Sequence, residues 1–239
     1  MDNNTNTNNE ITFISFNIHH GADAKNIYNL NNIISDIKKS NADIIALQEV
    51  DNNHSKRSNN DNQPEIFSKE LALKSSKYIF FGPNVEKSYG NLIINTKNEF
   101  KDVKNNQLPS PLKSEKRGFI TSEFIVSKDN NVLLINTHFG LGDQEKIDQF
   151  KYIASYINSV ENNFNSIIII GDLNTQIISS DLNIFTDLGF INCNTKFPTF
   201  RDTIIDYIFI KGKVNCKDVD VINVNSSDHF LLRAKLVFE

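Results

Sequence analysis

Acids, amides and histidines recur where apolar segments of this chain begin or end. Asp172 and Asn174 follow four consecutive isoleucines at 167–170, and Asp228 and His229 immediately precede the last apolar segment. An acid beside a fully buried strand is costly unless its site requires it. Carboxylates that meet in one cleft repel each other and need protonation, a cationic partner or a metal. The pattern therefore indicates a site that combines acid–base chemistry with cation binding.

Four acids lie within or directly beside apolar segments, and four of the five histidines lie at the ends of such segments. The acids are Glu49, Asp172, Asp206 and Asp228, and the histidines are His19, His20, His138 and His229. A single histidine or acid is more often structural, as a core residue, a strand-end cap or a salt-bridge partner. Four histidines at equivalent positions favour a functional site, although one or two of them can still be structural.

The adjacent pair Asp228 and His229 can serve two purposes, because neighbouring side chains of a strand point in opposite directions. We expect Asp228 to face a metal and His229 to face the substrate. A catalytic histidine usually has its second ring nitrogen held by a carboxylate. Asp206, within the apolar segment 204–210, is the candidate partner of His229.

The candidate ligands suit a hard cation. Carboxylate and amide oxygens with no cysteine favour Mg²⁺ or Mn²⁺ over structural zinc. The two cysteines, Cys193 and Cys216, match no zinc-binding spacing and are expected to be free thiols.

The elements that must position these residues can be inferred from periodicity. β-Branched and alternating segments predict strands, and apolar residues at helical spacing predict helices. We expect strands at 11–16, 43–47, 78–81, 92–95, 119–126, 132–136, 167–170, 204–210, 214–224 and 230–238, and helices at 27–40, 64–73, 147–160 and 180–188. The polar stretch 52–64, with Arg57 in its middle, is expected to be a functional or mobile loop.

The chain contains an internal echo. In the first half, Asn17-Ile18-His19-His20-Gly21 is succeeded by a helix and then by a buried strand that ends in an acid. In the second half, Asn136-Thr137-His138-Phe139-Gly140 is succeeded by the same two elements. Chance similarity of two strand–helix–strand units is the alternative explanation. The shared spacing favours two similar half-sheets that face each other, with their polar strand ends converging.

Length and composition indicate one globular domain at 10–239 after a disordered leader at 1–9. The net charge of −4 and pI of about 5.8 argue against a strongly basic nucleic-acid surface, but allow a local basic patch or a metal. No signal-peptide pattern or membrane-spanning segment is found, so we expect a cytoplasmic protein, with secretion left open. We expect a monomer.

Taken together, the motifs resemble the endonuclease/exonuclease/phosphatase superfamily, which includes deoxyribonuclease I, abasic-site endonucleases, neutral sphingomyelinases and inositol-polyphosphate 5-phosphatases. The resemblance rests on six motifs in the family's order: F-N-I at Asn17, L-Q-E at Glu49, T-H at His138, G-D-L-N at Asp172 and Asn174, D-Y-I-F at Asp206, and S-D-H at Asp228 and His229. It implies an α/β fold, a four-layer sandwich of two facing mixed β-sheets flanked by helices.

The resemblance also implies roles. Asn17, Glu49 and Asp228 correspond to Mg²⁺ or Mn²⁺ ligands, and His229 with Asp206 to a His–Asp pair. Asp172 would orient or deprotonate the attacking water, and Asn174 and His138 would hydrogen-bond the phosphate in its transition state. Whether Asp172 or His229 is the base, and whether one or two metals act, stays open. Candidate substrate contacts are Arg57, Arg117, Asn91 and His19, although the two arginines can equally be ordinary surface residues.

We therefore expect a divalent-metal-dependent phosphoesterase, most simply a phosphodiesterase. A nucleic acid is the first substrate to consider, and a phospholipid headgroup or a small phosphorylated metabolite is the alternative. The inositol-phosphatase signature is absent around Asp206, which is followed by Tyr207. The competing class is a non-catalytic binding protein that kept the fold. No matched catalytic position is substituted, and this argues against that class.

Overall fold

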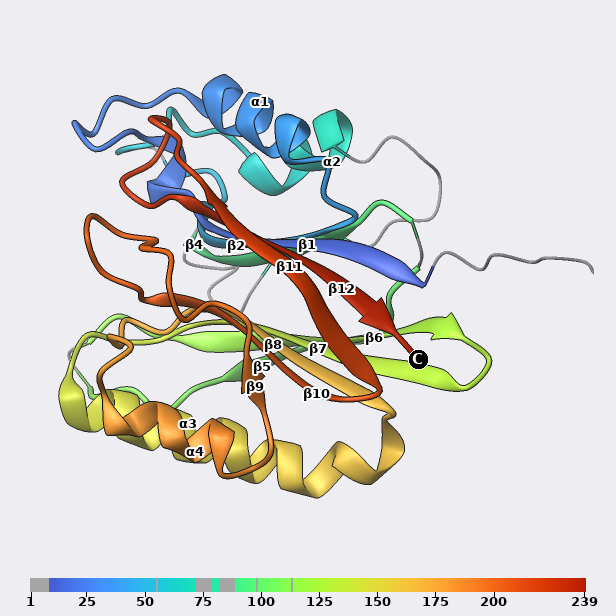
Figure 1. Cartoon of the computed structure of the whole chain (residues 1–239). Coiled ribbons are helices and arrows are strands. Elements are labelled where there is room, and N and C mark those ends of the chain that lie inside the picture. Colours follow the sequence, from blue (N-terminus) through green and yellow to red (C-terminus); the bar gives the residue numbers. More distant parts are fainter. Residues whose placement is uncertain (1–8, 55, 72–78, 82–88, 98, 113) are drawn as a thin grey trace, which may run out of the picture.

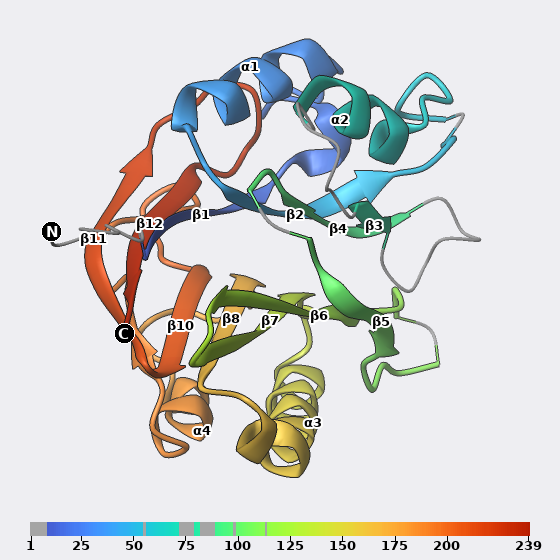
Figure 2. The same cartoon turned by 90° about the vertical axis from the view of Figure 1, so that its right-hand side faces the viewer.

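Two six-stranded β-sheets pack face to face, and helices cover their outer faces (Figures 1 and 2). This is a computed structural model, which describes residues 9–54, 56–71, 79–81, 89–97, 99–112 and 114–239. The four-layer α/β sandwich that the motifs imply is confirmed.

The first sheet has the strand order β11-β12-β1-β2-β4-β3, and the second has the order β5-β6-β7-β8-β10-β9. The strands of the first sheet are β1 (Glu10–Asn17), β2 (Ile44–Asp51), β3 (Ile79–Phe81), β4 (Tyr89–Asn95), β11 (Val214–Ile222) and β12 (Leu231–Phe238). Those of the second are β5 (Lys101–Gln107), β6 (Gly118–Ser127), β7 (Asn130–His138), β8 (Ser166–Asp172), β9 (Ile191–Asn192) and β10 (Asp206–Gly212).

The two sheets share one pattern of pairing. In each, the two central strands are parallel, β1 with β2 and β7 with β8, and every other pair is antiparallel. Parallel strands require a crossover, and helices supply it in both sheets. The chain therefore forms two similar half-sheets, as the internal echo predicts.

The first sheet is covered by α1 (Leu30–Ser40) and α2 (Gln63–Leu71), and the second by α3 (Asp143–Val160) and α4 (Asn183–Thr186) (Figures 1 and 2). Short 3₁₀ turns are η1 (His19–Gly21), η3 (Glu161–Asn163) and η4 (Ser180–Leu182). No helix within the described ranges is long and apolar enough to cross a membrane.

The isoleucine run in β8 shows how the layers are held together. Ile168 and Ile170 point into the core between the sheets, whereas Ile167 and Ile169 point into the core beneath α3. A continuous apolar run is what a strand buried on both faces requires. Each fully buried isoleucine contributes about 1.5–3 kcal/mol of transfer free energy.

Several element boundaries differ from the sequence prediction. The first helix begins at Leu30 rather than at 27, because the side chain of Asn29 caps it by accepting a hydrogen bond from the backbone of Asn32. Ile27 is consequently an exposed loop residue. The helix expected at 180–188 is instead η4 followed by the single turn of α4. The edge strands β5 and β9 were not predicted, because β5 is polar and exposed and β9 has only two residues.

Some predicted features lie outside the described residues. These are the leader at positions 1–8, positions 72–73 at the end of the second predicted helix, and Tyr78 at the start of a predicted strand. The strand register brings the polar residues of the second sheet into one row, since Gly118 pairs with His138, His138 with Asp172, and Asp172 with Asp206. The candidate site therefore lies at the end of the sandwich where these strands meet.

Candidate active site

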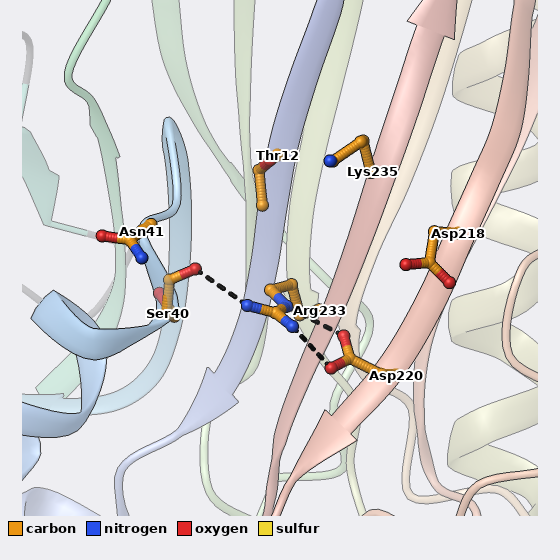
Figure 3. Close-up of a pocket in the computed structure, with 7 residues that line it drawn as sticks. All are labelled: Thr12, Ser40, Asn41, Asp218, Asp220, Arg233 and Lys235. Atoms are coloured by element: carbon orange, nitrogen blue, oxygen red, sulfur yellow. Dashed lines mark hydrogen bonds and ion pairs between the residues drawn. The ribbon is translucent and has the colours of Figure 1, made fainter.

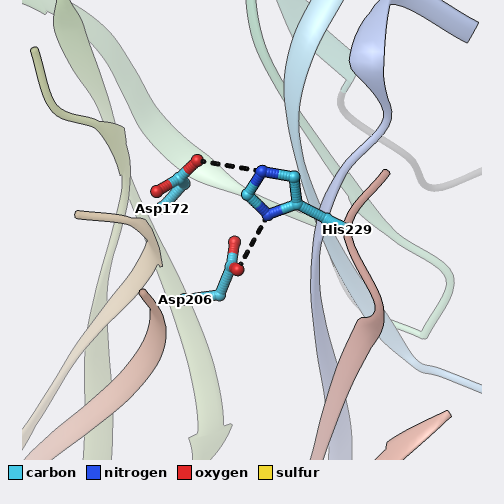
Figure 4. A group of neighbouring side chains, drawn as sticks. All are labelled: Asp172, Asp206 and His229. Atoms are coloured by element: carbon cyan, nitrogen blue, oxygen red, sulfur yellow. Dashed lines mark hydrogen bonds and ion pairs between the residues drawn. The ribbon is translucent and has the colours of Figure 1, made fainter. Parts of the chain in front are cut away.

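The centre of the site is a histidine from the loop before β12 of the first sheet, which reaches two acids of the second sheet. Nδ1 of His229 lies 2.9 Å from Oδ2 of Asp206, and Nε2 of His229 lies 3.7 Å from Oδ2 of Asp172 (Figure 4). All three side chains are buried. The arrangement fixes the histidine ring through one nitrogen and leaves the other facing Asp172.

Burial and neighbouring charges set the pKa of each member. Burial alone would lower the pKa of His229, but the charge of Asp206 and its hydrogen bond, together with Asp172, raise it to about 10. The pKa of Asp172 is raised to about 7, first by burial and then by the nearby charge of Asp206. At neutral pH, His229 is therefore an imidazolium paired with Asp206, and Asp172 can gain or lose its proton.

Asp172 is held by donors on several sides. The Asn17 side-chain amide donates to Oδ2 of Asp172 at 3.0 Å, and the backbone N–H of Asn174 donates to Oδ1 at 2.9 Å. Nε2 of His138 lies 3.5 Å from Oδ2. A carboxylate held in this way has a fixed orientation, which a group that must align a water molecule requires.

His138 lies beneath an arginine. Nη1 of Arg117 is 2.8 Å from Nδ1 of His138 and 3.3 Å from Nε2. A donor this close to both ring nitrogens is not aligned with the lone pair of either one. Burial, the Arg117 charge and His229 hold the pKa of His138 well below its usual range. His138 is therefore a neutral imidazole, and its Nε2 lies 3.2 Å from the amide nitrogen of Asn174.

The first sheet contributes a second group of oxygen-bearing side chains. The amide nitrogen of Asn17 donates to Oε1 of Glu49 at 3.1 Å as well as to Asp172. Asp228 follows in the loop before β12, where Ser227 donates to the backbone carbonyl of Asn17 at 2.8 Å. Nδ1 of His19 lies 3.9 Å from Oδ1 of Asp228. The predicted ligands Asn17, Glu49 and Asp228 therefore lie at the same end of the first sheet.

Three of the candidate site residues, His19 with φ 44°, Glu49 and Asn174, have left-handed backbone conformations. Glu49 has φ 59° at an irregularity in the pairing of β2 with β4, and Asn174 has φ 47° just after β8. Such conformations cost free energy in residues other than glycine, and they often mark functional sites. At Glu49 the irregularity interrupts the alternation of side chains at the end of β2.

Gly171 explains how β8 can approach β7 so closely beside the site. It has φ 144°, and a Cβ at this position would lie 1.9 Å from the carbonyl oxygen of Thr137. Only glycine fits this position without displacing the strand. The glycine of the G-D-L-N motif therefore sets the position of Asp172 against His138.

All four predicted substrate contacts have partners within the protein, Arg117 with His138 as described above and the other three as follows. Both Nε and Nη2 of Arg57 bond the buried carboxylate of Asp51, at 2.9 and 2.7 Å, and the guanidinium lies 4.9 Å from the centre of the Tyr89 ring. Asn91 donates to the backbone carbonyl of Gly118 at 3.1 Å. Nδ1 of His19 also lies 3.2 Å from the carbonyl oxygen of Asp23.

Sequence reasoning assigned no role to two residues that hold His229. The Phe200 ring packs against the imidazole with 4.7 Å between ring centres, and Oγ of Ser227 accepts a hydrogen bond from the backbone N–H of His229 at 3.2 Å. Ser227 belongs to the S-D-H motif, so the motif pointed to it. The segment Pro198-Thr199-Phe200 carries no motif, and its sequence predicts only a loop.

A polar hollow of about 260 Å³ lies elsewhere, between the end of α1 and the outer face of the first sheet (Figure 3). It is lined by Thr12, Ser40, Asn41, Asp218, Asp220, Arg233 and Lys235. Arg233 bonds both carboxylate oxygens of Asp220, at 2.8 and 2.6 Å, and the backbone carbonyl of Ser40 at 3.2 Å. This hollow takes no part in the candidate site.

Residues 14–229 match the family model described as the endonuclease/exonuclease/phosphatase family. The chain belongs to this family. The resemblance of the six motifs is thereby confirmed, and members of the family are phosphoric-ester hydrolases. A search of the curated proteins gives no match.

Solved structures of low sequence identity share the fold. A family member from Bacteroides vulgatus is 18% identical, with a TM-score of 0.78 over 96% of this chain and 99% of its own. The mannosyl-6-phosphatase Bt3783 of Bacteroides thetaiotaomicron is 16% identical, with a TM-score of 0.74 over 95% and 100%. The human Nocturnin catalytic domain, solved with a bound sulfate anion, is 18% identical, with a TM-score of 0.72 over 97% and 95%.

Proposed function

We propose that this protein is a divalent-metal-dependent phosphodiesterase. The observation that carries the proposal is that His229 is paired with Asp206 and faces Asp172, which is itself held by Asn17 and Asn174. Hydrolysis of a phosphodiester needs a group to take the proton of water and donors to stabilise the charge that builds up on the phosphate. This site contains both kinds of group within a few ångströms.

The residues of the first sheet suit a hard cation. The amide nitrogen of Asn17 lies between the carboxylates of Glu49 and Asp172, so acids from both sheets converge on one small region. A cation would stabilise this convergence. The possible ligand atoms are carboxylate oxygens and the amide oxygen of Asn17, which are the kinds of atom that Mg²⁺ and Mn²⁺ prefer. Asn17, Glu49 and Asp228 would hold the ion. When bound, the metal would neutralise a non-bridging phosphate oxygen and polarise the phosphorus.

The atoms of Asp172, Asp206 and His229 also lie close enough together, within 4.8 Å, to hold an ion. We assign these three to proton handling, because the ring nitrogen of His229 that faces Asp206 is already committed to it.

The protonation states of these residues indicate which residue acts in each step of the proposed hydrolysis. Asp172 accepts the proton of the attacking water, since its pKa of about 7 lets it act as a base near neutral pH. His229, kept protonated by Asp206, donates a hydrogen bond from Nε2 to the phosphate and stabilises the developing charge. Neutral His138 and the amide of Asn174 lie beside Asp172 and would bind the non-bridging oxygens.

The test is hydrolysis of a panel of substrates, with Mg²⁺ or Mn²⁺ compared with EDTA. The panel contains bis-p-nitrophenyl phosphate, p-nitrophenyl phosphate, plasmid DNA, RNA and a sphingomyelin-type lipid. It therefore includes nucleic acids, the first substrate to consider from the sequence, and a phospholipid, the alternative substrate. We expect metal-dependent cleavage of at least one diester, reduced by about a thousandfold or more in His229→Ala. Activity near wild type in His229→Ala would remove that residue from the mechanism.

A silent panel would favour the competing class, a binding protein with this fold. Thermal unfolding with and without millimolar Mg²⁺ or Mn²⁺ separates the two cases, because a ligand that binds only the folded state stabilises it. We expect a rise in Tm with metal that is reduced in Glu49→Gln.

A further inference from the structure

Large apolar side chains project into solvent around the candidate site. The described part of the chain exposes eight of them, and five lie in loops at the end of the sandwich that carries the site, on the left in Figure 1. Four belong to loops of the second sheet: Leu112 is 99% exposed, Ile178 87%, Leu141 73% and Phe197 40%. We call these four residues the apolar rim.

The strand register places the apolar rim around the catalytic residues. Leu112 lies in the loop between β5 and β6, whose ends Gln107 and Gly118 pair with each other, and Gly118 pairs with His138. Leu141 follows His138 by three residues, and Ile178 follows Asn174 by four. Phe197 lies in the loop that leads to Asp206 through Phe200, which packs on His229.

The local sequence holds three of these side chains outward. Leu141 stands between Gly140 and Gly142, Leu112 follows Pro111, and Phe197 precedes Pro198. Proline fixes its own φ and restricts the residue before it, and the two glycines offer Leu141 no side chain of their own to pack against. Full exposure of an aliphatic side chain loses the free energy that burial would give, so several such side chains at the end of the molecule that carries the site indicate a surface that becomes covered.

The charge of these loops differs from that of the whole chain. By sequence, the loops 108–116, 139–142, 173–179 and 193–205 carry four basic and two acidic residues, whereas the chain has a net charge of −4. One of the acids, Glu115, pairs with the buried Arg117 at 3.2 Å. Apolar side chains with basic neighbours are the combination that binds an anionic lipid surface.

The shape and chemistry of the apolar rim distinguish a lipid surface from a nucleic acid. Single-stranded nucleic acids bind aromatic side chains on which bases stack, but three of the four rim residues are aliphatic and the chain has no tryptophan. A drug-sized ligand usually occupies a pocket of about 300–1,000 Å³, whereas the hollow beside His138 holds only about 10 Å³. Separate projecting tips match a partner into which each can insert.

We propose that this end of the molecule docks on a phospholipid bilayer containing anionic lipids, with the apolar rim inserted among the lipids, and that the scissile diester is a phospholipid headgroup. The substrate assignment rests on the proposed phosphodiesterase function, whereas the docking surface can be measured without any turnover. From the sequence, a nucleic acid is the first substrate to consider, whereas this proposal favours a phospholipid as the substrate.

The absence of tryptophan makes a direct test possible. Leu141→Trp and Ile178→Trp each place a single tryptophan on the apolar rim, and Ile125→Trp places one on the β6–β7 hairpin, where Ile125 is 47% exposed at the opposite end of the second sheet. Vesicles of phosphatidylcholine with phosphatidylserine, in EDTA, should shift the emission of the two rim variants to shorter wavelength and leave the hairpin variant unchanged. No shift in the rim variants, or an equal shift in the hairpin variant, overturns the docking surface.

Vesicle flotation measures affinity with matched variants. The double variant Leu141→Asp with Ile178→Asp should weaken binding at least about tenfold, because each aliphatic side chain no longer enters the apolar phase. Ile125→Asp should bind as wild type does. Equal binding by the double variant and wild type, or preferential binding of duplex DNA over the vesicles, contradicts the proposal.

Turnover separates failure of the substrate assignment from failure of the proposed function. Wild type is given phosphatidylcholine–phosphatidylserine vesicles and, separately, bis-p-nitrophenyl phosphate with Mg²⁺ or Mn²⁺. The ratio of lipid to soluble-diester hydrolysis should fall about tenfold or more in the double variant and remain unchanged in Ile125→Asp. Cleavage of the soluble diester without any lipid cleavage overturns the lipid as substrate, whereas cleavage of neither the soluble diester nor the lipid counts against the phosphodiesterase function itself.

Discussion

The two sheets have the same strand order and pairing, yet the ends of their central strands differ in chemistry. In the first sheet the chain turns aside after Asn17, and that side chain enters the site. In the second sheet β7 continues to His138, so the echoed Asn136 lies two residues deeper. There its amide bonds the backbone carbonyls of Leu47 and Leu92 and accepts a hydrogen bond from Gln48. One repeated framework therefore holds a proposed metal ligand, Asn17, on one side and a structural cross-link, Asn136, on the other.

The backbone positions the acids near the ends of β2 and β8 in two different ways. β8 uses Gly171 to bring Asp172 close to β7. β2 has an irregularity at Glu49, whose φ is 59°. The difference suggests a division of labour in which the second sheet supplies the groups proposed to move protons, and the first supplies the groups proposed to hold a metal. His229 is the first-sheet residue that joins the two.

The largest effect that the comparison predicts is at Asp172. Asp172→Asn should lower diesterase activity by about 10² to 10⁴, because it removes the base. The same change should raise Tm in EDTA, since burial raises the pKa of this carboxyl from 3.8 to about 7. The unfolded chain gives up that proton near pH 4, so the native protein loses stability as pH rises from about 4 to about 7.

Thermal unfolding of both proteins at pH 5 and pH 8 checks the sign. The Tm advantage of Asp172→Asn should grow with pH and be largest above pH 7. An advantage that shrinks with rising pH would show that Asp172 is not a destabilised buried acid.

A smaller effect is expected from the acid of the first sheet. Glu49→Gln should raise the Mg²⁺ or Mn²⁺ concentration for half-maximal activity by about tenfold or more, because a neutral amide is a weaker ligand for a hard cation. Activity is measured over a metal titration with bis-p-nitrophenyl phosphate. An unchanged metal requirement would remove Glu49 from the ligands and end the division of labour between the sheets.

Gly171→Ala tests the close approach of β8 to β7. The added methyl group would meet the Thr137 carbonyl, so the variant should lose about 2 kcal/mol or more of unfolding free energy. Gly142→Ala is the matched control, because a Cβ there meets nothing closer than 3.5 Å. Denaturant unfolding of the two variants provides the comparison, and equal stabilities would contradict the assigned role of the glycine.

The smallest effect is expected at His19, the echo of His138. His19 lies on η1, 3.9 Å from Asp228 and away from the row of second-sheet residues. His19→Ala should change kcat of the soluble diester by no more than about twofold, because its ring contacts Asp228, Asp23 and His20 but none of the residues proposed to transfer protons. A loss comparable with that of a catalytic position would restore the functional equivalence of the two histidines.

Local pattern predicted two similar half-sheets and the strand ends at which the site lies, because isoleucine-rich strands and the repeated order of elements are visible in the sequence. The four layers were implied by the resemblance of the six motifs to the family. Local pattern missed β5, whose polar sequence Lys101–Gln107 carries no apolar alternation and forms an edge by pairing with β6. It also equated Asn17 with Asn136, since identical spacing in sequence does not reveal where a strand stops.

Contacts between distant segments were beyond pattern reasoning. Arg117 meets His138 only because Gly118 and His138 are register partners. Phe200 reaches His229 through a loop that carries no motif. Such contacts depend on tertiary register, which no single segment encodes. The pairing of His229 with Asp206 was proposed from chemistry alone, and the structure places Nδ1 of His229 2.9 Å from Oδ2 of Asp206.

The central claim is that His229 from the first sheet and Asp206 from the second act as one catalytic unit. A double-mutant cycle on kcat/KM for bis-p-nitrophenyl phosphate, with His229→Ala, Asp206→Asn and the double variant, measures this directly. Residues that act as a unit show non-additive losses, so the double variant should be no slower than His229→Ala alone. Losses that add, with the double variant slower by the product of the two single factors, would contradict the claim.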